Sequence, residues 1–262
     1  MTATPSESPP SESPPSDRLV LAEDVGAVRT ITFNRPTRLN AFTAASYARL
    51  STLLREAAVD DDVRVVLLRG EGRAFSSGVD LEELSGGDEG NLALRDNFDQ
   101  LIAVLVDHPK PLIAAVHGPA VGFGATMLLH CDLVLVADDA RLRFPFSSLR
   151  TAPEAGSSAL LPAAVGPQRA AELLFTSRWI GADEAVEIGL ALACYPREQL
   201  QGQARELAER IAQQPAAAVE SVKRLLRTER AEMVRDASAR ERAEAQRLGV
   251  ALGSFGSSPV PE

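Results

Sequence analysis

Short runs of apolar residues that alternate with stretches of helical periodicity constrain the fold of this chain more than any other feature. The runs are rich in Val, Leu and Ile, and they show little alternation between polar and apolar side chains. Such runs are typical of strands that are covered on both faces, so the pattern predicts an α/β fold. The predicted strands are residues 19–22, 28–33, 63–68, 111–116 and 133–137. The predicted helices among them are residues 44–57, 92–106 and 122–130.

The two ends of the chain differ from this alternating core. Residues 2–17 hold almost only Ser, Pro, Glu and Thr, and such a composition cannot bury enough apolar surface to fold. We therefore expect a disordered tail at residues 1–17 and a core at residues 18–197. Residues 198–262 are predicted to be a C-terminal helical region. Its expected helices are residues 198–212, 215–228 and 229–248.

Composition excludes several classes of function. The chain of 262 residues carries a formal net charge of −9, which disfavours a nucleic-acid partner because neutralising phosphates requires a basic surface. Its cysteines, Cys131 and Cys194, fit no metal-binding or disulfide pattern, so we expect no metal site. No stretch approaches the about 18 consecutive apolar residues of a membrane span. These features predict a cytoplasmic protein that binds neither nucleic acid nor membrane.

Two glycine-containing turns are the strongest indication of function. Residues 73–81 read Arg-Ala-Phe-Ser-Ser-Gly-Val-Asp-Leu, and residues 117–126 read His-Gly-Pro-Ala-Val-Gly-Phe-Gly-Ala-Thr; each follows a predicted strand. Glycine permits a positive φ and lets the backbone approach a ligand, and Gly78, Gly122 and Gly124 meet that need. Two such turns can direct backbone N–H groups at one point, which predicts a site that stabilises an oxyanion.

Together with Asn34-Arg-Pro and Leu39-Asn-Ala upstream, these turns resemble the motifs of the crotonase superfamily. The resemblance implies a crotonase-like ββα spiral and a substrate that is a thioester of coenzyme A, with no further cofactor. It also implies that the C-terminal helices cover the active site and build a homotrimer or a dimer of trimers.

The resemblance further assigns roles to individual residues. The backbone N–H groups of Val79 and Phe123 would hold the thioester oxygen, and Arg38 would be a phosphate contact. Because Phe123 interrupts a run of glycines, its side chain must point away from the oxyanion or line the acyl pocket. The residues that the resemblance places at the acyl-CoA are Arg38, Leu39, Ala41, Ala74, Ser76, Gly78, Val79, Asp80, Leu81, Gly122 and Phe123.

The proton carrier departs from the hydratase pattern. Hydratases carry a glutamate in the helix after the second turn and another after the proline of the next loop, but this chain has Thr126 and Phe146 there. Residues 145–158 resemble instead the loop of the peroxisomal-type Δ3,Δ2-enoyl-CoA isomerases, in which one glutamate is the base. Carried over, Glu154 would move the double bond of a 3-enoyl-CoA to the 2-position, in fatty-acid β-oxidation. An apolar wall of Phe146, Leu149 and Phe123 would raise its pKa by desolvation.

Other interpretations of these residues stay open. Glu154 in a Pro-Glu pair could simply begin the helix expected at residues 157–165. The chain could be a hydratase or another crotonase-type lyase that uses Glu154 and an ordered water, or an acyl-CoA-binding protein without catalysis. Asp80 could stabilise its turn or contact the ligand. We expect His117 to brace a loop by a hydrogen bond.

Overall fold

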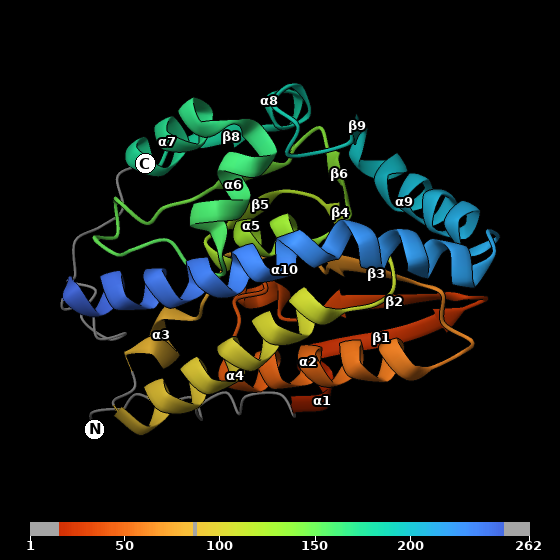
Figure 1. The fold of residues 1–262 in the computed structure, drawn as a ribbon, viewed down its shortest axis with the longest axis horizontal. Helices are drawn as coiled ribbons and strands as arrows, with labels where there is room; N and C mark the ends of the chain where they lie inside the picture. Colours follow the sequence, from red (N-terminus) through yellow and green to blue (C-terminus); the bar gives the residue numbers. More distant parts are fainter. Residues whose placement is uncertain (1–15, 86–87, 249–262) are drawn as a thin grey trace, which may run out of the picture.

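A computed structural model describes residues 16–85 and 88–248 of the chain, and its main element is a six-stranded sheet (Figure 1). The strand order is β1-β2-β3-β4-β6-β9, in which only the β1–β2 pair is antiparallel. The strands are β1 (Val20–Val25), β2 (Val28–Phe33), β3 (Val65–Gly70), β4 (Leu112–Val116), β6 (Leu133–Ala137) and β9 (Ala193–Tyr195). The predicted α/β class is thus confirmed.

Helices cover both faces of this sheet, as the continuous apolar runs predict (Figure 1). In β3, Val66 and Leu68 belong to the larger apolar core on the side of helices α2 (Ala44–Val59) and α4 (Asp88–Asp107). The alternate residues, Val65 and Leu67, pack on the opposite face against helix α9 (Arg197–Ala212). Burial on both faces is the reason that polar residues are so rare in the central strands.

A second, smaller sheet is stacked beside the first and carries one of the two glycine turns. It consists of β5 (Pro119–Val121), β7 (Arg141–Arg143) and β8 (Trp179–Gly181) in the order β5-β7-β8. Single β-bridges join Ser76 to Ala120 and Phe42 to Val79. The loop that follows β3 is therefore bridged to β5 of the small sheet at Ser76 and to the loop that follows β2 at Val79.

The remaining helices surround the end of the sheets where the turns meet. Short elements follow the turns, and the long helix α10 (Ala216–Arg247) runs across the molecule and packs on both α6 and α4 (Figure 1). The other helical elements are α1 (Ser16–Leu19), η1 (Pro36–Arg38), α3 (Leu81–Leu84), α5 (Phe123–Thr126), η2 (Met127–His130), α6 (Ser157–Val165), α7 (Pro167–Thr176) and α8 (Ala182–Glu187). No helix in the described ranges is long and apolar enough to cross a membrane.

Three features of the fold differ from the sequence predictions. The separate helices expected at 215–228 and 229–248 are wrong: α10 is continuous, since its residues include no Pro or Gly that would end a helix. The helix expected at 122–130 divides into α5 and the 3-10 helix η2. Ser16 and Asp17, which were expected in the tail, form the start of α1. The rest of the predicted tail, residues 1–15, lies outside the described residues.

Candidate active site

The two glycine turns lie against each other so closely that only glycine fits at the contact. A Cβ atom added to Gly78, which has φ of 91°, would lie 2.6 Å from the Val121 carbonyl oxygen and 3.3 Å from the Phe123 nitrogen. A Cβ atom on Gly124 would lie 2.5 Å from the Ser76 carbonyl oxygen. The sequence motifs, some forty residues apart, are therefore adjacent in space. This proximity brings the backbone of Val79 and Phe123 together.

The amide of Val79 is left free by the way its turn is paired. Phe42 donates its amide to the Gly78 carbonyl oxygen at 2.7 Å and accepts the Asp80 amide at 2.8 Å. In such a parallel bridge the partner residue itself, here Val79, turns its own amide away. Among the hydrogen bonds of the described residues, none uses the Val79 amide as donor. An amide in this position can bind an oxygen of a ligand.

The amide of Phe123 is presented by an unusual backbone conformation at Gly122. Gly122 has φ of 54° and ψ of −121°, which residues with a Cβ atom rarely adopt. Phe123 is the first residue of α5, where the amide has no acceptor within the helix. Its amide, like that of Val79, donates no hydrogen bond within the described part of the chain. The turn thus supplies a second free donor beside the first.

The Phe123 side chain points into the core rather than toward these donors. Its ring is 1% exposed and makes edge-to-face contacts with Phe42, Tyr47 and Phe98 at centroid distances of 5.2, 5.2 and 5.3 Å. Aromatic pairs in this geometry are stabilised beyond the burial of their area. The ring therefore anchors the turn, while the backbone of the same residue remains available.

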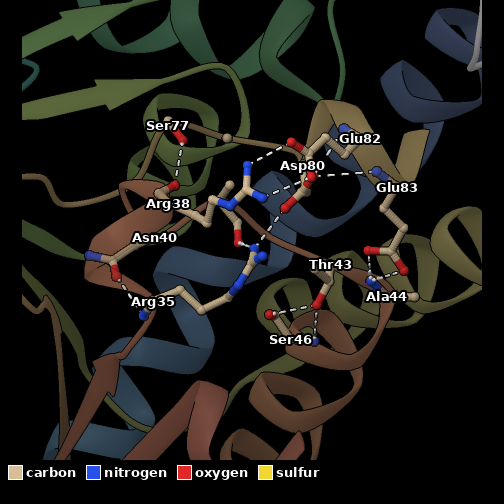
Figure 2. A network of polar contacts seen from close by, with 12 residues as sticks. Arg35, Arg38, Asn40, Thr43, Ala44, Ser46, Ser77, Asp80, Glu82 and Glu83 are labelled. Carbon is tan, nitrogen blue, oxygen red and sulfur yellow. Dashed lines mark hydrogen bonds and ion pairs between the residues drawn. The ribbon is translucent and has the colours of Figure 1, made fainter. Parts of the chain in front are cut away.

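Asp80 braces the first turn, as Figure 2 shows. One carboxylate oxygen pairs with Arg35 at 2.8 Å, and the other accepts the amides of Glu82 and Glu83 at 3.0 and 3.3 Å. Burial by itself raises the pKa of Asp80, but the hydrogen bonds from Arg35 and the two amides outweigh it and lower that pKa below its ordinary value. The turn-stabilising interpretation of Asp80 is confirmed, and a ligand contact stays a prediction.

Arg38, the predicted phosphate contact, is exposed at the rim of the same network (Figure 2). Its guanidinium group makes a bidentate pair with Glu82, at 2.6 and 3.0 Å. A ligand phosphate would have to compete with this carboxylate. Nearby, the Ser77 amide donates to the Leu39 carbonyl oxygen at 2.9 Å, and the Ser76 hydroxyl donates to that of Asn40 at 2.9 Å.

The other predicted acyl-CoA contacts fall in the same region but differ in exposure. The structure brings segments 38–41, 74–82 and 121–123 together. Within them Ala41, Ala74 and Ser76 are buried and Leu81 is exposed. Because Ala41 and Ala74 have little exposed surface, any contact of theirs with a ligand would involve few atoms.

Glu154 lies in the loop before α6 and is partly buried. Burial, and next the negative charge of Glu241, raise its pKa to about 8. The charge of Glu154 acts in turn on Tyr47, whose pKa is raised first by its own burial and then by Glu154. Tyr47 stacks on Phe42 and contacts Phe123. Tyr47, on which the Glu154 charge acts, is thus a member of the aromatic cluster that anchors the second turn.

The structure does not support helix capping as the role of the Glu154 side chain. The Glu154 carbonyl oxygen accepts the Ser157 amide at 3.0 Å, but its carboxyl group makes no hydrogen bond within the described residues. The amides at the start of α6 are bound instead by Glu241, which sequence reasoning missed. Phe146 is buried and Leu149 partly buried, and their predicted contact with Glu154 stays a prediction.

Other polar residues nearby have structural roles. Thr126, at one of the positions where hydratases carry glutamate, is buried, and its hydroxyl donates to the Phe123 carbonyl oxygen at 3.4 Å. His117 bonds the Gly72 carbonyl oxygen at 3.0 Å, which confirms its expected bracing role. Within residues 16–85 and 88–248, no group of three or more His, Cys, Asp or Glu side chains could hold a metal ion.

Comparison with known proteins links this arrangement to enzymes that act on coenzyme A thioesters. Residues 23–250 match the family model for enoyl-CoA hydratase/isomerase. The chain is 35% identical to the 1,2-epoxyphenylacetyl-CoA isomerase of Escherichia coli (strain K12), over 75% of this chain and 77% of that protein. It is 37% identical to 4-chlorobenzoyl coenzyme A dehalogenase-1 of Arthrobacter, over 76% and 74%. It is 38% identical to enoyl-CoA delta isomerase 2 of Rattus norvegicus, over 68% of this chain and 46% of that protein.

The fold is shared with solved structures of similar sequence. An enoyl-CoA hydratase/isomerase from Pseudoalteromonas atlantica T6c superposes with a TM-score of 0.82 at 33% identity, covering 90% of this chain and 93% of the other. This likeness confirms the spiral fold that the motifs predicted. Relatives whose names state three different reactions are 35–38% identical to this chain, so the reaction has to be argued from the proton carrier.

Proposed function

The chain belongs to the enoyl-CoA hydratase/isomerase family, and we propose that it moves the double bond of a 3-enoyl-CoA to the 2-position. The observation that supports this proposal is the Glu154 carboxyl group, which makes no hydrogen bond within the described residues, while neither hydratase position holds an acid. Glu154 is partly buried in the loop before α6, whereas the hydratase positions hold Thr126 and Phe146. Hydration requires one group to activate water and another to deliver a proton. Double-bond transfer requires only one group that takes and returns the same proton.

In the first step, the Glu154 carboxylate removes a proton from C2 of the acyl chain. The electrons of the broken C–H bond move onto the thioester oxygen, and a dienolate forms. The free amides of Val79 and Phe123 stabilise that negative charge without having to reorganise, and one such donor is typically worth ~10²–10³ in rate.

In the second step, protonated Glu154 returns the proton to C4. The electrons return from the oxygen through C2, so a double bond forms between C2 and C3 and the one between C3 and C4 is lost. Atoms and charge balance, and Glu154 ends as the carboxylate. The raised pKa of Glu154, about 8, suits this double role, because a carrier is most efficient when its pKa lies near the working pH.

The test follows the ultraviolet absorbance of the conjugated 2-enoyl thioester when purified protein is mixed with a 3-enoyl-CoA. Wild type is expected to produce conjugation. Glu154→Gln is expected to lose ~10² or more of the rate, as for a lost general base. Glu198→Gln, an exposed glutamate at the start of α9, is the matched control and should retain wild-type activity.

The outcomes separate the alternatives. Water addition to a 2-enoyl-CoA that depends on Glu154 would identify a hydratase and contradict the proposal. Binding of the CoA ester with neither reaction would identify an acyl-CoA-binding protein. Conjugation that persists in Glu154→Gln would refute the assignment of the proton carrier.

A further inference from the structure

We propose that Glu241 of α10 is a positioning residue for Glu154: Glu241 binds and holds the loop that carries Glu154. The proposal rests on the proposed function, because it assigns Glu241 a part in the work of that proton carrier. It concerns a residue that follows the loop by more than eighty positions in the sequence. Glu241 does not itself carry the proton.

Both oxygens of the Glu241 carboxylate are bound to the backbone of the loop. Oε2 accepts the Gly156 amide at 2.8 Å, and Oε1 accepts the Ser158 amide at 2.8 Å. The residue is only 6% exposed. A bidentate acceptor of this kind fixes both the distance and the orientation of the loop relative to α10. Glu154 lies two residues before Gly156, so its placement follows from this clamp.

Close packing adds to the clamp at the same point. A Cβ atom on Gly156, which has φ of 72°, would lie 2.8 Å from Cγ1 of Val234 on α10. Val234 is 1% exposed and lies two turns before Glu241 on the helix. The helix can therefore approach the loop to hydrogen-bonding distance only because position 156 has no side chain.

The loop needs such support because its backbone is strained beside the carrier. Ala155 has φ of 59°, a left-handed conformation that is unfavourable for a residue with a Cβ atom. His130 holds this residue by donating from Nε2 to the Ala155 carbonyl oxygen at 2.8 Å. Burial lowers the pKa of His130 to about 4, so the ring is neutral at neutral pH. The backbone conformation beside Glu154 is thus held by His130 on η2 and by Glu241 on α10.

The clamp also has an electrostatic consequence for Glu154. Burial contributes most to the raised pKa of Glu154, and the charge of Glu241 on α10 comes next; the charge of Glu154 in turn raises the pKa of Tyr47 on α2. Glu241 exerts this effect through its charge, while its two oxygens hold the backbone amides of the loop. Loss of its charge should therefore let Glu154 ionise at lower pH, while loss of its bonds should let Glu154 move.

The experiment compares Glu241→Gln with Glu244→Gln in the full-length protein. Glu244 is on the same helix and is exposed, with a hydrogen bond from Arg247 at 2.7 Å. Glu241→Gln is expected to lower kcat by up to ~10²-fold, as a displacement of about 1 Å can do, with KM unchanged. The pH at which the rate of the Glu241→Gln variant rises should also move to a lower value. Glu244→Gln should match wild type in both respects.

A second measurement does not require activity. The Glu154 carboxyl is titrated by carbon-13 nuclear magnetic resonance of glutamate-labelled protein, with Glu154→Gln used to assign its signal. The midpoint should fall in Glu241→Gln and stay in place in Glu244→Gln. An inactive wild type would refute the proposed function alone, while this titration still tests the influence of Glu241.

Two results would overturn the inference. One is a folded Glu241→Gln protein with wild-type kcat and an unchanged Glu154 midpoint. The other would come from Glu241→Asp, a variant that keeps the charge and replaces the Gln variant in these measurements if that variant does not fold. It should lower kcat because its side chain is one methylene shorter, yet keep the midpoint near that of wild type. Wild-type kcat in the Asp variant would exclude positioning by Glu241.

Discussion

At the scale of the residue, the proposed mechanism makes the protonation of Glu154 set the pH dependence of the reaction. Its pKa is raised to about 8 by burial and by Glu241. The first step needs the carboxylate, which in the free protein increases as pH rises through that value. We therefore expect kcat/KM of the wild type to rise with pH and to level off above about 8. A profile of kcat/KM from pH 5 to 10 checks this. A rise in kcat/KM near the ordinary pKa of a glutamate would contradict it.

Gly122 offers a test of the oxyanion donors that leaves their side chains intact. Gly122→Ala introduces a Cβ atom that meets nothing within 4 Å, but φ of 54° with ψ of −121° is strained for alanine. The peptide should rotate and turn the Phe123 amide away. We expect kcat to fall ~10²–10³-fold, measured by the conjugation assay, with a nearly unchanged Tm.

The matched control for that substitution is Gly181→Ala. Gly181 also has open space around it, but its φ of −79° and ψ of 170° suit alanine. It should retain wild-type activity. Equal losses in both variants would show that the conformation at Gly122 is not the reason for its effect.

Sequence reasoning could identify residues whose role is tied to a local pattern. The glycine turns and Asp80 belong to contiguous motifs and lie where those motifs predicted. Glu154 also stands in a contiguous motif, and its catalytic role stays a prediction. Glu241 and Tyr47 could not be found this way. Glu241 lies among many charged residues of a helix, and nothing in its own neighbourhood indicates that it is buried against a distant loop.

At the scale of the element, the contact between α10 and the 154–158 loop can be tested by packing. Gly156→Ala should destabilise the protein because of the positive φ and the 2.8 Å approach to Val234. Overpacking of this kind typically costs about 1–3 kcal/mol. Val234→Ala alone should also destabilise, by leaving a cavity.

The double variant of Gly156 and Val234 should be more stable than the sum of the single losses predicts, because the shorter side chain relieves the clash. Urea unfolding of the four proteins gives the coupling free energy. Strict additivity would mean that α10 moves away freely and does not clamp the loop.

Elements with a long periodic pattern were predictable, and very short ones were not. The central strands fall within two residues of their predicted bounds because their apolar runs are covered on both faces. The strands β5, β7, β8 and β9 have three residues each, too few for any periodicity. The division of α10 into two helices was wrong because its interior is mostly exposed and polar, so sequence periodicity gave no measure of its length.

At the scale of the whole molecule, the buried carboxyl group should reduce stability. The pKa of Glu154 is raised in the folded state, so the native protein binds more protons than the unfolded chain between about pH 4.3 and 8. The free energy of unfolding therefore falls as pH rises through this window. We expect Glu154→Gln to be more stable than wild type at pH 8 and above, by ~0.5–2 kcal/mol.

Thermal unfolding at pH 5 and pH 8.5 checks this prediction. The advantage of the glutamine variant should be small at the lower pH and larger at the higher one. An advantage that is independent of pH would mean that the charge of Glu154 is not its cause.

The long separation between Glu241 and the loop it binds has a consequence for how the protein is made. The chain emerges from the ribosome with its N-terminus first, and domains begin to fold during synthesis. The strands of both sheets, which end with β9 at Tyr195, can assemble while α10 is still being translated. The amides of Gly156 and Ser158, in the loop around Glu154, gain their acceptor only when residue 241 has emerged. If Glu241 positions Glu154 as we propose, catalytic competence is among the last properties that a nascent chain acquires, and an unfinished chain would be folded in its centre before it could turn over substrate.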